Sequence, residues 1–163
     1  MQPDYYTTFP PLGLLKLAAY HRDIGDNVLP LVIGEKKING KPDLIYITSL
    51  FTFSWKEVHN AVHYYKDCFP KAKVWLGGVY ASIMPKHAAA SGADYVHSGI
   101  FEKAETYPPA YDMWDKQWDG SIIFSSRGCI RNCGFCAVPK IEGRPSRIQG
   151  SIKKFVSDKH SKI

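Results

Sequence analysis

The sequence lacks any apolar run that approaches the roughly 20 residues needed to cross a bilayer. It also lacks a signal-peptide pattern, because Pro3 and Asp4 follow closely on Met1 and precede two tyrosines. Cysteine is scarce, with four residues in a chain of 163, so we do not expect a framework of disulfides. These absences argue against a membrane protein, and we expect a cytoplasmic location.

The excess of positive over negative charge is also small, since the net charge is only +6. Much of the positive charge lies near the carboxyl end, at Arg144, Arg147, Lys153, Lys154, Lys159 and Lys162. Few aromatic residues are interleaved there, so a solvated face is favoured over a nucleic-acid-binding surface. Nucleic acid is therefore not an expected partner. The content of 45% hydrophobic and 22% charged residues is typical of a globular protein with a proper core.

Three of the four cysteines, Cys129, Cys133 and Cys136, lie within eight residues in a Cys-x3-Cys-x2-Cys pattern. A disulfide would be strained in so short a loop, whereas a metal or iron–sulfur cluster collects several thiolates at once. A structural zinc site usually takes four ligands in two separated pairs, and the other candidates, Cys68 and His160, are distant in sequence. A [4Fe–4S] cluster with one open iron therefore fits the pattern better than zinc does.

This segment resembles the signature of the radical S-adenosylmethionine (SAM) superfamily, Cys-x3-Cys-x-aromatic-Cys, with Phe135 at the aromatic position. The resemblance implies that Cys129, Cys133 and Cys136 ligate a [4Fe–4S] cluster. It also implies that the open iron binds SAM and that Phe135 lies by its adenine. An electron from a donor such as ferredoxin or flavodoxin would cleave SAM into methionine and a 5′-deoxyadenosyl radical. The substrate, small or macromolecular, stays unidentified. The alternative is a non-catalytic module with a zinc or electron-transfer iron–sulfur centre.

Four residues around the cysteines fit the same interpretation. Gly128 and Gly134 have no Cβ, so the backbone can turn sharply and pass close to a cluster. Arg127 and Arg131 would place positive charge beside a cluster that is anionic.

Strand and helix patterns alternate over the first hundred residues. Apolar runs predict strands at 28–33, 43–49, 73–77 and 94–97, and helical spacing predicts helices at 11–23, 54–68 and 82–91. Ser54 and Glu57 have the spacing of a capping box. The alternation predicts an α/β fold, a Rossmann-like parallel sheet flanked by helices. Such a sheet normally begins with a strand, and none is evident before the first helix, so we expect the amino end to be cut short.

The remaining residues predict a second, incomplete domain. Residues 105–120 contain Pro108–Pro109 and two tryptophans, and we interpret them as a linker. A strand at 121–126, the cysteine segment and a helix at 149–160 would form the first βα unit of a radical SAM TIM-type barrel. A barrel takes about 200 residues or more, and only 27 follow Cys136. Residues 121–163 are therefore expected to be a truncated domain, and the chain alone is expected to be inactive.

Residues 1–104 also resemble the cobalamin-binding domain that precedes the barrel in many radical SAM enzymes. Thr48-Ser49-Leu50 follows the second predicted strand and Gly77-Gly78 follows the third, where that family has Ser-x-Leu and Gly-Gly. The resemblance implies that these residues line the slot for the nucleotide tail of cobalamin, in an enzyme of cobalamin-dependent methyl transfer. Loops at the carboxyl ends of parallel strands form such crevices. The alternative is a Rossmann-like domain without cofactor, in which Gly77-Gly78 is simply a strand-to-helix turn.

Two further motifs are absent. The Asp-x-His-x-x-Gly motif, which supplies a histidine to cobalt in cobalamin domains, does not occur. The chain's histidines in this region lack that context and are expected to be surface or hydrogen-bonded residues: His21, His59, His63, His87 and His97. A tRNA methylthiotransferase is disfavoured, because that family carries several cluster cysteines in its amino-terminal domain. This chain has only Cys68 there, which we expect to be packed as a small apolar residue.

Overall fold

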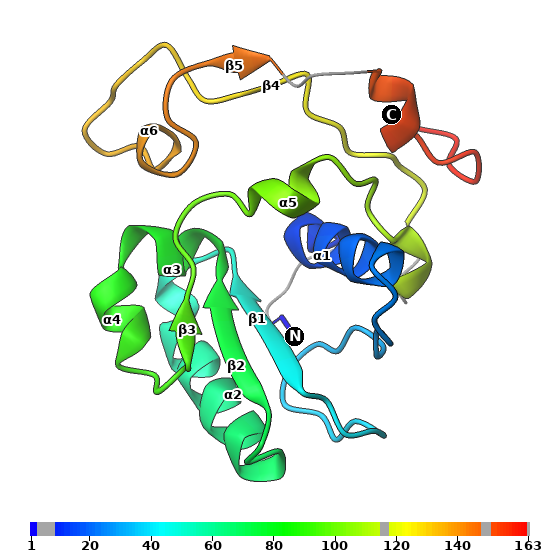
Figure 1. The fold of residues 1–163 in the computed structure, drawn as a ribbon. Helices are drawn as coiled ribbons and strands as arrows, with labels where there is room; N and C mark the ends of the chain where they lie inside the picture. The colour runs from blue at the N-terminus through cyan, green and yellow to red at the C-terminus, as the bar shows by residue number, and fades with distance from the viewer. Residues whose placement is uncertain (3–8, 115–117, 148–150, 163) are drawn as a thin grey trace. The chain divides into compact units, whose positions relative to one another are not determined.

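The computed structural model describes residues 1–2, 9–114, 118–147 and 151–162 (Figure 1). Its contacts divide the chain into two compact units. Unit 1 comprises Met1–Tyr6 and Leu29–Gly99, and unit 2 comprises Thr7–Val28 and Ile100–Ile163. Each unit therefore combines two separate stretches of the chain. The division into a cobalamin-type domain, a linker and a truncated barrel stays a prediction.

Unit 1 contains a three-stranded parallel sheet, which confirms the predicted α/β character. The strands lie in the order β1 (Leu44–Ser49), β2 (Lys73–Gly77) and β3 (Tyr95–Val96). Leu44 pairs with Lys73 and Thr48 pairs with Gly77, so β1 and β2 end together at one edge of the sheet. The loops that follow these two strands are therefore neighbours, as the carboxyl ends of parallel strands must be.

Helices accompany the sheet in unit 1. A 3-10 turn (Thr52–Ser54) leads into α2 (Trp55–Cys68), and α3 (Gly78–Ile83) and α4 (Pro85–Ala89) replace the single helix predicted at 82–91. Pro85 separates them because it cannot donate the hydrogen bond that would continue α3.

Ser54 is the N-cap of α2, but its side chain accepts no capping bond, so the predicted capping box is wrong. The backbone of Ser54, at φ −84° and ψ 21°, lacks the extended conformation that capping requires.

The core of unit 1 follows from two sequence periods. Alternate residues of β1 and β2 are buried, namely Ile45, Ile47, Val74 and Leu76. The buried residues of α2 recur every three or four positions, namely Val58, Ala61, Val62 and Tyr65. All eight belong to one core cluster, so one face of the sheet packs against one face of α2. None of the described helices is long and apolar enough to span a membrane.

The first two residues occupy a position that the sequence did not reveal. Gln2 pairs with Ile33 in a parallel bridge, and the carbonyl oxygen of Met1 accepts the Thr48 N–H at 2.9 Å. Met1 and Gln2 thus lie beside β1, where a doubly wound sheet has its first strand. The strand predicted at 28–33 is reduced to the single bridge at Ile33. Two residues are too few to show a hydrophobic period, so the pairing of Met1 and Gln2 could not be predicted from the sequence.

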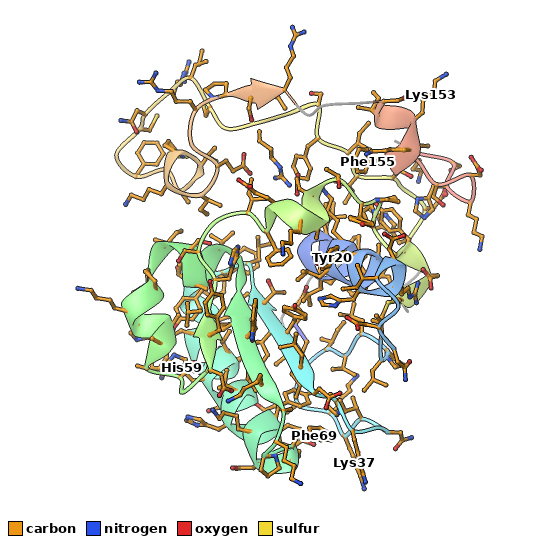
Figure 2. All side chains as sticks on the ribbon, in the orientation of Figure 1. Tyr20, Lys37, His59, Phe69, Lys153 and Phe155 are labelled. Atoms are coloured by element: carbon orange, nitrogen blue, oxygen red, sulfur yellow. The ribbon has the colours of Figure 1, made fainter. Side chains whose placement is uncertain are left out.

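Unit 2 begins with α1 (Leu12–Asp23), as predicted, which ends before Gly25 at φ +91°. α5 (Glu102–Glu105) and a 3-10 turn (Tyr111–Met113) lie along it. The Ala110 N–H donates to the Leu15 carbonyl at 3.1 Å, and the rings of Tyr20 and Tyr107 lie 5.6 Å apart. Figure 2 labels Tyr20 on α1. The segment interpreted as a linker is therefore packed against α1 over much of its described length.

The cysteine segment of unit 2 differs from the predicted βα unit. β4 (Ser126–Arg127) pairs with β5 (Ser146–Arg147) in an antiparallel ladder, and α6 (Val138–Ile141) lies between them in sequence. The strand predicted at 121–126 is wrong over most of its length, because the Ser121 N–H and hydroxyl bond to residues 157–162 instead. The described part of the helix predicted at 149–160 is only a 3-10 turn, Ile152–Phe155, and residues 149–150 lie outside the described residues. The barrel unit is not confirmed.

Asp94 connects three elements of unit 1. Its carboxylate accepts the Val74 N–H of β2 at 2.9 Å and lies 3.3 Å from the ammonium groups of Lys66 and Lys73. The Asp94 N–H in turn donates to the Val74 carbonyl at 2.8 Å. The backbone hydrogen bond from Val74, together with the two lysines, lowers the pKa of Asp94 from 3.8 to about 2.

Replacement of Asp94 by alanine should lower the free energy of unfolding by about 1 kcal/mol, because the Val74 N–H loses its side-chain acceptor. A carboxyl group with a lowered folded-state pKa stabilises the fold above its unfolded pKa, near 4, and this contribution disappears as the pH falls toward 2. Urea unfolding between pH 7 and pH 2 measures both effects. The exposed Asp67 on α2 supplies the control, and an Asp94→Ala curve that matches Asp67→Ala would contradict the assignment.

Candidate functional site

The cysteine loop, residues 129–136, carries all three predicted cluster ligands. Cys129, Cys133 and Cys136 are free thiols of intermediate exposure. The Cys136 N–H donates to the Cys133 carbonyl at 3.0 Å, which closes a turn between the second and third cysteines. The Arg131 N–H points at the Cys129 sulfur, 3.4 Å away. Backbone N–H groups that bond cysteine sulfur are among the factors that tune iron–sulfur centres.

The loop keeps its thiols available without gathering them at one point. Over the described parts of the chain, no three His, Cys, Asp or Glu side chains converge closely enough to hold an ion. Ile130 is 90% exposed and Phe135 is 95% exposed, so few contacts fix the middle of the loop. The donor chemistry fits a [4Fe–4S] cluster, with three free thiols in one short segment and a backbone donor on one sulfur. Phe135 lies in solvent, and its contact with adenine stays a prediction.

The two glycines beside the cysteines differ in what they do. Gly128 has φ +79°, and a Cβ there would lie 2.6 Å from the Arg144 carbonyl oxygen. Gly134 has no positive φ, and a Cβ there would meet nothing within 4 Å. The structure therefore requires glycine at 128, where the chain passes close to another backbone segment. It gives no such reason for Gly134.

Arg127 does not carry the free positive charge expected of it. Its guanidinium pairs with Glu105 at 2.8 Å and with Glu142 at 2.9 Å, so two carboxylates offset its charge. Arg131 keeps an exposed side chain. Sequence reasoning missed Glu105 and Glu142, because neither stands in a recognisable motif. The sequence signal for the network was Arg127 itself, a basic residue just before the cysteines.

A second candidate site lies at the carboxyl edge of the sheet in unit 1, where β1 and β2 end (Figure 1). Ser49 and Gly78 form a parallel bridge, so the two predicted cobalamin-binding segments are adjacent. Gly78 has φ +90°, and a Cβ there would lie 2.5 Å from the Ser49 oxygen and 2.6 Å from Thr48 Oγ1. Leu50 is 51% exposed at the same edge. Close packing alone accounts for Gly78, and the cofactor role of Thr48, Ser49, Leu50, Gly77 and Gly78 stays a prediction.

Two histidines of unit 1 bond to a buried tyrosine. The Tyr80 hydroxyl lies 2.9 Å from His59 Nε2 and 2.6 Å from His87 Nδ1, and Figure 2 labels His59 on α2. Burial, with the nearby His87 and His63, lowers the pKa of His59. His21 bonds to Asp26 at 2.7 Å. His21, His59 and His87 are thus hydrogen-bonded, as expected.

Cys68 differs from its prediction, because it is exposed at the end of α2 rather than packed. Phe69, the C-cap of α2, packs against the core cluster of unit 1 instead. Cys68 belongs to unit 1, whereas the cysteine loop belongs to unit 2.

Comparison with curated proteins finds two relatives, each called "Ribosomal protein uS12 methylthiotransferase RimO", from Flavobacterium psychrophilum and Flavobacterium johnsoniae. Each is 26% identical to this chain over 133 residues, which cover 78% of this chain and 25% of the relative. The chain therefore spans about a quarter of the length of these relatives. No family model matches the chain. No solved structure matches it.

The similarity supports the resemblance to the radical SAM superfamily and to an enzyme family. It does not show a cobalamin-binding domain. A tRNA methylthiotransferase was disfavoured from the sequence because Cys68 is the only cysteine in the amino-terminal domain. The two relatives are instead named as methylthiotransferases of ribosomal protein uS12.

Gly78→Ala should destabilise unit 1 by at least about 1 kcal/mol, because alanine is strained at positive φ and its Cβ would overlap the backbone of Ser49. Gly77→Ala is the matched control, since the nearest atom to its Cβ is His97 Cβ at 4.0 Å. Thermal unfolding of the two variants measures the difference. Equal midpoints for Gly78→Ala and Gly77→Ala would show that the close approach is not as described.

A second pair of glycine variants tests the start of the cysteine loop. Gly128→Ala should lower the thermal midpoint, again by the equivalent of at least about 1 kcal/mol, since its Cβ would displace the Arg144 backbone. Gly134→Ala should leave the midpoint unchanged, because its Cβ enters open space. Differential scanning calorimetry of both variants against the unaltered chain decides the matter. A loss of stability in Gly134→Ala as large as in Gly128→Ala would refute this account.

Proposed function

We propose that the cysteine loop binds a [4Fe–4S] cluster through Cys129, Cys133 and Cys136, as part of a radical SAM enzyme. The observation that carries this proposal is the set of three free thiols in one short loop, at the spacing and with the aromatic residue that mark the superfamily. The similarity to two methylthiotransferases supports the same superfamily. The cytoplasm, as a reducing compartment, would keep these thiols available.

Each part of the loop has a task in this proposal. When bound, a cluster of this kind supplies an electron and an open iron position for SAM. The three thiolates hold it, and the Arg131 N–H at the Cys129 sulfur stabilises negative charge there. Phe135 is exposed and free to cover a flat ring such as adenine. Ligand binding would also gather the thiols, since metal sites commonly take their final shape only when filled.

Two reactions are proposed as alternatives. One is cobalamin-dependent methyl transfer, in which Thr48, Ser49, Leu50, Gly77 and Gly78 line the slot for the cofactor tail. The other is transfer of a methylthio group to a protein, which the names of the two relatives favour. In either case the electron would come from a small redox protein such as ferredoxin or flavodoxin. Anaerobic purification with added cobalamin, followed by an absorbance spectrum, separates the two.

The competing function is a non-catalytic zinc module. It would need a fourth ligand, because structural zinc is almost always four-coordinate. The other candidate ligands, Cys68 and His160, are distant from the loop in sequence. The metal that the purified chain contains therefore distinguishes the enzyme from the zinc module.

Anaerobic reconstitution with iron and sulfide should give a brown chain with about four irons. Each of Cys129→Ser, Cys133→Ser and Cys136→Ser should lose most of this iron, because each removes one of three ligands. Cys68→Ser is the control and should keep the full amount, since Cys68 lies in unit 1. Iron, sulfide and zinc analysis measures the result. One zinc per chain without iron, or equal iron in all four variants, would overturn the cluster.

A further inference from the structure

An ion-pair network lies directly before the cysteine loop. Arg127 Nε and Nη2 donate to Glu105 Oε1 at 2.9 and 2.8 Å, and Nη1 donates to Glu142 Oε1 at 2.9 Å. The other oxygen of Glu142 accepts the Gly128 N–H at 2.7 Å. The guanidinium also stacks on Phe124, with its carbon 3.6 Å from the ring centroid. The two residues that precede Cys129 are therefore held by four strong contacts to charged groups.

The network continues to α1 through Lys16. Lys16 Nζ lies 3.1 Å from Glu105 Oε2 and donates to the Glu105 carbonyl at 3.2 Å. Lys16 is only 6% exposed, and burial lowers its pKa while the carboxylate of Glu105 raises it. Two cations and two carboxylates alternate along the network. Because the members are largely withdrawn from water, loss of one leaves its neighbour charged and unpaired.

We propose that Glu105 and Glu142 are positioning residues for the cluster. Acting through Arg127 and the Gly128 N–H, they set the direction in which the chain enters the cysteine loop, and Lys16 holds Glu105 in place. This inference rests on the proposed function, namely that the three cysteines hold a [4Fe–4S] cluster. It extends the machinery of the site to α1 and α5, which lie far from the cysteines in sequence.

The geometry favours positioning over simple stabilisation. The middle of the loop is exposed, with Ile130 and Phe135 almost fully in solvent. Arg127 and Gly128 are thus the point at which the loop is fixed on its amino-terminal side. A carboxylate that holds both the side chain of one residue and the backbone N–H of the next constrains position and direction together. Removing it should therefore change how the thiols meet a cluster more than it changes the rest of unit 2.

The first experiment uses the metal-free full chain. Glu105→Gln and Glu142→Gln keep the size of the side chain but remove its charge. Amide hydrogen exchange in residues 127–136 should become about tenfold faster in both, because a charge-assisted hydrogen bond is weakened. Amides of α1, which lies in the same unit, should exchange as in the unaltered chain, which shows that the fold of unit 2 is kept. The exposed Glu102 on α5 gives the matched control, Glu102→Gln.

The second experiment uses the reconstituted chain and a ferrous chelator. Iron loss should be about tenfold faster in Glu105→Gln and Glu142→Gln than in Glu102→Gln or the unaltered chain. The electron paramagnetic resonance spectrum of the reduced cluster should also change in these two variants. Lys16→Met should accelerate iron loss, because it leaves the carboxylate of Glu105 without one of its cations.

The outcomes are distinguishable. Faster exchange together with faster iron loss and an altered spectrum supports the positioning role. Faster exchange with unchanged iron retention and spectrum overturns it and leaves a structural ion pair. Unchanged exchange and retention in both variants also overturn it. If the unaltered chain takes up no iron, the proposed function itself fails, and this result appears before any variant is compared.

Discussion

Close approach of two backbone segments, possible only beside a glycine, underlies both candidate sites. At Gly78 a Cβ would lie 2.5 Å from the Ser49 oxygen, and at Gly128 it would lie 2.6 Å from the Arg144 oxygen. Both glycines have positive φ and immediately follow a strand. The chain can therefore turn sharply at the end of a strand and set the next segment against a neighbouring loop. The turn at Gly78 sets the position of α3 in unit 1, and the turn at Gly128 sets the position of the cysteine loop in unit 2.

The fold was predictable where a period extends over many residues. β1 and β2 combine burial on one face with parallel pairing, and α2 places Val58, Val62 and Tyr65 on one stripe. Such repeated patterns identify a strand or a helix even when the element that packs against it is unknown. Met1 and Gln2 pair with β1 through backbone groups alone, which leaves no trace in residue type. The strand predicted at 121–126 failed because Ser121, just before its apolar residues, bonds to Ser157 near the end of the chain, and no local pattern encodes that contact.

The candidate ligands were predictable and their surroundings were not. Cysteine spacing is a local property of the chain, so Cys129, Cys133 and Cys136 could be identified from sequence. The partners of Arg127 come from residues 105 and 142, and their pairing depends on how α1, α5 and β4 pack in unit 2. The same limit explains why Arg127 was expected to present free charge. A single sequence shows which residues are charged but not which charges meet.

The pairing of Lys16 with Glu105, 89 positions apart, has a consequence for biogenesis. While the ribosome synthesises the protein, α1 emerges long before α5, and the whole sheet of unit 1 is made in between. Unit 1 can condense as soon as β3 has been synthesised, whereas α1 must wait for its partner α5. Non-local contacts of this kind slow folding, because a long loop must close before they form. A nascent chain stalled near residue 100 would thus offer α1 to chaperones.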